Sequence, residues 1–167
     1  MKKIYLAGGC FWGLEEYFKQ IKGVTRTIVG YANGSTNNPE YKTIKETNHV
    51  ETVYIEYDTN IVGLEFLLEM FYKVIDPVSV NKQGEDEGTQ YRSGIYYTEK
   101  LDLEIINNSI LNLENKLNVK TVIEIEELKG FYNAEEYHQD YLEKNPNGYC
   151  HIGKSSFEDA KNAIPKK

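Results

Sequence analysis

The sequence has few of the features that mark several common classes of protein. It holds only two cysteines, three histidines and no Cys-x-x-Cys pair, so a zinc site is not expected. No apolar run approaches the ~18–20 residues of a membrane span, and the N-terminus lacks the pattern of a secretory signal. The net charge of −7 lacks the basic excess of nucleic-acid-binding proteins. We therefore expect a cytoplasmic protein without a metal, nucleic-acid or membrane partner.

The composition is sufficient for a folded core. The chain has 167 residues, of which 40% are hydrophobic. A chain of this length suits one domain, and no repeat, linker or low-complexity tract divides it. We expect a single domain over residues 1–167, a tail from about residue 144, and a monomer.

Hydrophobic periodicity predicts an α+β fold. The first six predicted elements follow the order βαββαβ, which is typical of the ferredoxin-like plait with its split βαβ core and helices on one face. A further helix, a further strand and a short helix follow, and then an irregular tail. The predicted ranges are 4–7, 11–22, 24–32, 50–57, 63–75 and 92–98 for the first six elements, then 99–117, 119–127 and 134–143.

The stretch Gly8-Gly9-Cys10-Phe11-Trp12-Gly13 joins the first predicted strand to the first helix. A cysteine at a helix start lies near unpaired backbone N–H groups and the positive end of the helix dipole, and both favour the reactive thiolate. The adjacent aromatic side chains provide an apolar surface beside the sulfur. The turn thus suits a nucleophile beside a hydrophobic pocket, although a buried structural cysteine fits the position equally well.

Two other positions carry chemical information, each with a simpler alternative. Glu51 shares a strand face with Val53, Ile55 and Tyr57. Burial on that face would raise its pKa and make it a general acid, unless it reaches water past the sheet edge. Cys150 lies in a tail rich in proline, glycine and asparagine. It is either a second thiol able to reach an oxidised Cys10 or a spectator.

Together these blocks resemble peptide methionine sulfoxide reductase, type A, over about residues 4–152. The pentapeptide Gly-Cys-Phe-Trp-Gly is highly specific for that family. The matching segments are residues 9–13, 29–32, 38–41, 49–51, 86–93, 137–141 and 147–150.

The resemblance implies how this chain reduces a sulfoxide. Cys10 matches the nucleophile that attacks the sulfur, and Glu51 matches the acid that protonates the oxygen. Tyr41 and Tyr91 match hydroxyls that hydrogen-bond the oxygen. Cys150 matches the resolving cysteine, which forms a disulfide with the nucleophile.

The resemblance also implies the substrate and the reductant. Phe11 and Trp12 match pocket walls around the substrate methyl group, and Asp86 and His138 match groups that hold the substrate main chain. The family acts on the S epimer of methionine sulfoxide, free or in oxidised proteins, with thioredoxin as the usual external reductant and no bound cofactor.

The departures from the family pattern are small. The loop before Glu51 is two residues shorter than usual, and Asn48 and Val50 replace a glycine and an alanine, which affects the expected shape of the loop. No second cysteine follows Cys150, so we expect a two-thiol cycle. Two other functions compete on the residues alone: a thiol peroxidase or disulfide oxidoreductase, and a non-catalytic methionine-binding module.

Overall fold

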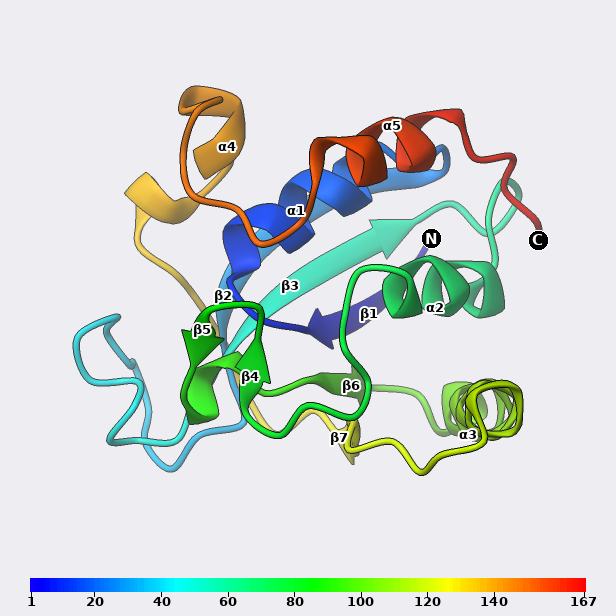
Figure 1. Ribbon diagram of the computed structural model, residues 1–167. Helices are drawn as coiled ribbons and strands as arrows, with labels where there is room; N and C mark the ends of the chain where they lie inside the picture. Colours follow the sequence, from blue (N-terminus) through cyan, green and yellow to red (C-terminus); the bar gives the residue numbers. More distant parts are fainter.

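A computed structural model describes residues 1–167 and contains a six-stranded mixed sheet flanked by helices (Figure 1). The strand order is β7-β6-β1-β3-β2-β8. Only β6 and β7 pair in parallel, and every other pair in this sheet is antiparallel. The strands are β1 Lys2–Ala7, β2 Val24–Ala32, β3 Val50–Tyr57, β6 Gly94–Tyr97, β7 Glu124–Glu127 and β8 Phe131–Asn133. The predicted α+β class is confirmed.

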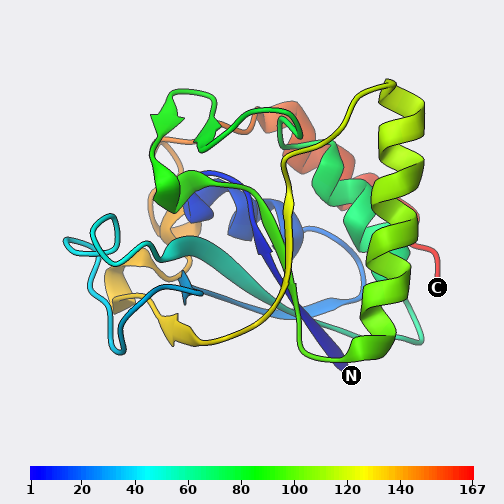
Figure 2. The same cartoon turned by 90° about the horizontal axis from the view of Figure 1, so that it is seen from below.

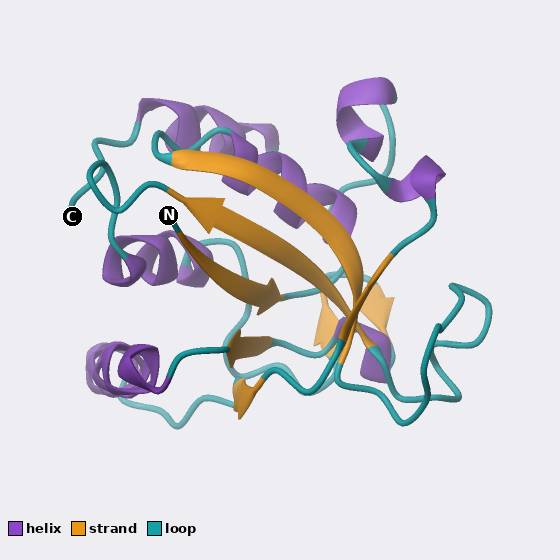
Figure 3. Cartoon of the chain, turned by 180° about the vertical axis from the view of Figure 1, so that it is seen from behind, coloured by secondary structure: helices purple, strands orange, loops and turns teal.

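The helices pack mainly on one face of this sheet, behind the strands in Figure 3. Helix α1 contacts β2, β3 and α5, whereas α3 contacts α2 and β6. Figure 2 shows the long α3 standing at one side of the molecule. The α-helices are α1 Phe11–Lys19, α2 Leu64–Tyr72, α3 Lys100–Leu117, α4 Tyr141–Lys144 and α5 Lys154–Asn162. None of them is long and apolar enough to cross a membrane.

Alternation along the strands divides the core between the two faces of the sheet. On β3, Val53, Ile55 and Tyr57 join the main cluster of 27 buried residues. Val50 points the other way, into a cluster of five buried residues on the opposite face. Glu51 is separated from Val53 by two positions and therefore points to the same face of the sheet, the one that the helices cover.

Several predicted boundaries are corrected by the structure. The stretch 79–90, between the predicted helix over 63–75 and the predicted strand over 92–98, contains a small hairpin, β4 Lys82–Gln83 and β5 Asp86–Glu87, and then a 3₁₀ turn at Thr89–Tyr91. The predicted strand over 119–127 is reduced to β7, because the residues before it do not pair with β6. The predicted short helix over 134–143 is split into a 3₁₀ turn at Glu136–His138 and the short α4.

The tail is also more ordered in secondary structure than predicted. Its residues include α5, which packs against α1 and buries Ala160 completely. The short strand β8 was not predicted; it pairs with the edge of β2. Both elements depend on contacts with distant segments, which periodicity within one window does not detect.

Candidate active site

The cysteine at the β1–α1 turn is held by the backbone around it. Gly9 has φ +82°, a conformation that favours glycine, and Cys10 is extended at the N-cap of α1. The Cys10 side chain makes no capping hydrogen bond and is 7% exposed. The sulfur is therefore buried at the helix start but does not cap the helix.

The environment of Cys10 does not favour its thiolate, contrary to the expectation from the helix start. Burial raises the pKa of the thiol above its ordinary range, and the nearby Glu51 carboxylate adds to this effect. The backbone N–H of Trp12 acts in the opposite direction but is outweighed. The argument from the helix dipole failed because it omitted desolvation and a carboxylate brought in by another strand.

Glu51 faces this turn from β3. It is 1% exposed, and its Oε1 accepts a hydrogen bond of 3.2 Å from the Phe11 backbone N–H. Burial raises the pKa of Glu51 to about 8; the Phe11 bond lowers it and the charge of Asp86 raises it. The prediction of a raised pKa is confirmed, and the alternative of a solvated strand end is wrong. At neutral pH the carboxyl is mostly protonated and can donate a proton.

Two tyrosines predicted from different loops come together near this acid. Burial raises the pKa values of Tyr41 and Tyr91, and the Glu51 carboxylate raises both further. An interaction between the two hydroxyls lowers the pKa of Tyr41 and raises that of Tyr91. Both phenols thus remain protonated and able to donate hydrogen bonds.

An aromatic cluster surrounds the start of α1. His138 is 2% exposed, and its Nδ1 accepts a 3.0 Å hydrogen bond from the Trp12 Nε1–H. The imidazole ring lies 5.2 Å from the Phe11 ring and 4.9 Å from the Tyr41 ring, between centroids. Burial lowers the pKa of His138, although the Glu135 carboxylate raises it. The His138 imidazole is therefore neutral within this aromatic cluster.

Asp86 approaches the same place from the β4–β5 hairpin. Its charge raises the pKa values of both Cys10 and Glu51, and its Oδ2 accepts a 3.1 Å hydrogen bond from the Tyr149 hydroxyl. His151 lies nearby, with its Nδ1 3.8 Å from the same oxygen. The hairpin and the C-terminal tail therefore meet at Asp86.

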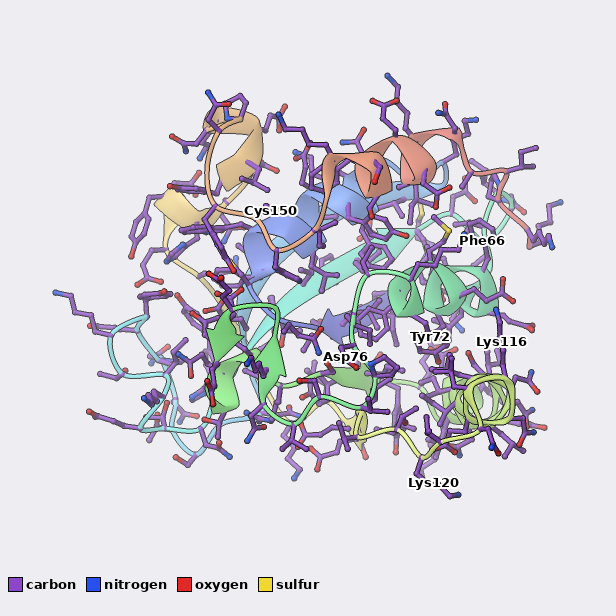
Figure 4. All side chains as sticks on the ribbon, viewed as in Figure 1. Phe66, Tyr72, Asp76, Lys116, Lys120 and Cys150 are labelled. Atoms are coloured by element: carbon purple, nitrogen blue, oxygen red, sulfur yellow. The ribbon has the colours of Figure 1, made fainter.

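Cys150 lies on the loop that passes over α1 before α5, as Figure 4 shows. Both cysteines are free thiols, and the Cys150 sulfur accepts a 3.3 Å hydrogen bond from the Ile152 backbone N–H. A Cβ added to Gly13 would lie only 2.6 Å from this sulfur. The second thiol therefore rests on the first turn of the helix that Cys10 begins.

All nine site residues predicted from the sequence thus belong to one region, but sequence reasoning missed some of their supports. Glu135 accepts hydrogen bonds from the Tyr31 hydroxyl at 2.6 Å and the Tyr41 backbone N–H at 3.2 Å, which fixes the loop of Tyr41. Tyr141 stacks on Trp12, with ring centroids 3.7 Å apart. Tyr141 lies in the matching segment 137–141 and could have been found there, whereas nothing in the sequence around Glu135 indicates its role.

Comparison with known proteins gives a consistent result. The model of the family described as "Peptide methionine sulfoxide reductase" matches residues 2–167. A peptide methionine sulfoxide reductase MsrA from Lachnoclostridium phytofermentans is 57% identical over 164 residues, which are 97% of this chain and 99% of that protein.

Solved structures are similar as well. Mxr1 from Saccharomyces cerevisiae in reduced form superimposes with a TM-score of 0.86 at 36% identity, over 91% of each chain. The structure of Mxr1 in complex with Trx2 has a TM-score of 0.62 at 27% identity, over 84% of each chain. These relatives share the arrangement of elements described above.

Proposed function

Since this chain belongs to the peptide methionine sulfoxide reductase family, type A, and is an enzyme that reduces methionine sulfoxide, we propose that Cys10 carries out the reduction on the S epimer. The Cys10 sulfur attacks the sulfoxide sulfur, and the sulfoxide oxygen passes to Cys10. The products are methionine and a sulfenic acid on Cys10. The substrates are free methionine sulfoxide and oxidised proteins.

Glu51 is the acid of this step. A sulfoxide oxygen leaves poorly until it is protonated, and a carboxyl with its pKa at about 8 holds a proton at neutral pH. The observation that carries the proposal is this buried carboxyl, hydrogen-bonded to the Phe11 N–H next to Cys10. Protonation of Glu51 also removes the negative charge that disfavours the Cys10 thiolate, so one proton assists both partners.

The remaining groups hold the substrate. Tyr41 and Tyr91 donate hydrogen bonds to the sulfoxide oxygen as charge develops on it, which their raised pKa values support. Phe11 and Trp12 form the walls around the methyl group. The contacts to the substrate main chain come from two other segments.

Asp86 and His138 bind that main chain, from the β4–β5 hairpin and the 3₁₀ turn Glu136–His138. Their proximity to the Cys10 turn supports this assignment. The charge of Asp86 acts on Cys10, and the His138 ring lies against Phe11. The cycle requires no bound cofactor.

Cys150 completes the cycle. Its thiol attacks the sulfenic sulfur of Cys10, a disulfide forms and water leaves. Thioredoxin then reduces the disulfide by exchange. The solved complex of the yeast relative with Trx2 supports the thioredoxin step, and the contact of the Cys150 sulfur with Gly13 supports the approach of the two thiols.

We extend the proposal to the organisation of the chain. The order β6-β1-β3-β2 and its antiparallel pairs support a ferredoxin-like, split βαβ core. The family match over residues 2–167 supports one catalytic domain, with the tail from about residue 144 carrying Cys150. We propose that this domain acts as a monomer in the cytoplasm.

Reduction of separated epimers tests the function. The purified protein is given S or R methionine sulfoxide with dithiothreitol, and methionine is measured. We expect methionine from the S epimer only. Equal reduction of both epimers, or faster consumption of hydrogen peroxide than of the S sulfoxide, would contradict the proposal.

A further inference from the structure

His151 is a buried imidazole to which the reduction step above gives no role. Its side chain is 5% exposed, and neither ring nitrogen makes a well-formed hydrogen bond, although the Gly8 carbonyl acts on the ring. An unpaired buried polar group costs free energy, so a side chain of this kind requires an explanation. Its position next to the resolving Cys150 suggests one.

The contacts of the ring place it beside the nucleophile. A Cβ added to Gly9 would lie 3.0 Å from the His151 Cε1 and 3.1 Å from its Nε2. A Cβ added to Gly13 would likewise lie 2.6 Å from the Cys150 sulfur. Cys10 lies between these two glycines in the chain, so the imidazole and the second thiol both contact the segment that carries it. Figure 1 shows the loop before α5 crossing the start of α1 there.

The resolving step needs a proton acceptor in this region. Burial raises the pKa of Cys150, and the charges of Asp86 and Glu16 raise it further, although the Ile152 N–H lowers it. The Cys150 thiol is therefore protonated at neutral pH, whereas the attacking species must be the thiolate. The charged groups that act on the two thiols are carboxylates and, for Cys10, the Cys150 thiol, and none of these stabilises a thiolate.

We propose that His151 accepts the thiol proton of Cys150 as Cys150 attacks the Cys10 sulfenic acid, and passes that proton to the departing hydroxide. The S–S bond forms and the S–O bond of the sulfenic acid breaks. The hydroxide and the proton leave as water, and no external oxidant or reductant is consumed. This inference rests on the proposed resolving role of Cys150.

The groups around His151 suit a neutral, oriented base. Burial lowers its pKa, while the Asp86 carboxylate and the Gly8 carbonyl raise it. Asp86 on the β4–β5 hairpin is the one charged group that acts on the ring. The titratable residues next to this contact along the chain are Cys10, which follows Gly9, and Tyr149 and Cys150, which precede His151. At pH 7 the imidazole is neutral, so it can take a proton, and Asp86 stabilises the cation that forms.

The test is the rate of disulfide formation in His151→Gln, whose amide has a similar length but does not act as a base. One equivalent of free methionine S-sulfoxide is added, and samples taken at intervals are quenched with an alkylating reagent. Methionine release and the Cys10–Cys150 disulfide are measured separately from pH 5 to pH 9. We expect the disulfide rate at pH 7 to fall by ~10²-fold in the variant.

The pH profile separates proton transfer from a structural role. The wild-type rate should be level at pH 7–8 and fall on acidification below the ordinary histidine pKa, because His151 becomes protonated. The rate of the variant should instead rise about tenfold per pH unit, following ionisation of the thiol itself. Imidazole added to His151→Ala should accelerate disulfide formation, and it should not affect the wild type.

Tyr149→Phe is the matched control, since it removes a tail contact with Asp86 but leaves His151. Its pH profile should keep the wild-type shape. A wild-type profile in His151→Gln, or an equal slowing of methionine release in that variant, would overturn the inference and leave the resolving role of Cys150 intact. A wild type without any Cys10–Cys150 disulfide would overturn both.

Discussion

The two cysteines lie in regions that are held by different means. Cys10 is 7% exposed, on a turn fixed by β1 and α1, next to a carboxyl from β3. Cys150 is half-buried on a loop, where its sulfur contacts Gly13 and accepts one backbone hydrogen bond. A nucleophile that must meet a substrate in one geometry lies in the core. A thiol that acts only after the first product forms lies on a loop outside the regular elements.

The largest expected effect is at Cys10. Cys10→Ser should abolish methionine formation, because a serine hydroxyl stays protonated and is a far weaker nucleophile than a thiol. The fold should be retained, since the sulfur makes no capping bond. Methionine formation and the far-ultraviolet circular dichroism spectrum check this, and residual turnover above about a tenth of wild type would remove Cys10 from its role.

The corresponding change at Cys150 should separate the reduction of the sulfoxide from the resolution of the sulfenic acid. Cys150→Ser should still form one equivalent of methionine, because the first turnover needs only Cys10, but turnover driven by thioredoxin should collapse. A small dithiol serves as the control, since it can attack the sulfenic acid directly and restore part of the activity. Normal cycling of the variant with thioredoxin would make Cys150 a spectator.

Glu51→Gln should slow the single-turnover formation of methionine by ~10²–10⁴-fold, because the amide hydrogen-bonds but gives no proton. The wild-type rate should fall above about pH 8, where the raised pKa of Glu51 lets the carboxyl ionise. The variant should lack that fall. An unchanged rate would show that this buried acid is structural.

The contact between the two regions can be altered at Gly13. Gly13→Ala places a methyl group against the Cys150 sulfur, so disulfide formation should slow by up to ~10²-fold while the first methionine still forms. Gly153→Ala is the matched control, because a Cβ there comes no closer than 3.8 Å to the Ser155 hydroxyl. Equal rates in the two variants would show that the contact has no part in resolution.

The core region was largely predictable from the sequence, and the tail was not. Period-two alternation on β3 placed Glu51 on the buried face, and the glycines around Cys10 indicated a strand–helix turn. These signals are local, so a single window of sequence contains them. The pKa of Cys10 was mispredicted because its causes, burial and the Glu51 carboxylate, come from distant parts of the chain.

The tail depends on contacts between distant segments. Helix α5 has a mostly polar sequence and is positioned by Ala160, which is buried where α5 packs against α1. Likewise, no local pattern brings His151 to Gly9 or Tyr149 to Asp86. The sequence identified which residues in the tail could react, but their neighbours follow only from the fold.

Non-reducing peptide mapping tests the link between the two regions most directly. Wild-type protein is given one equivalent of methionine S-sulfoxide without reductant, alkylated, digested and analysed by mass spectrometry. The account predicts a peptide pair joined through Cys10 and Cys150, with one methionine released per enzyme. Methionine release with both cysteines still separate would contradict it.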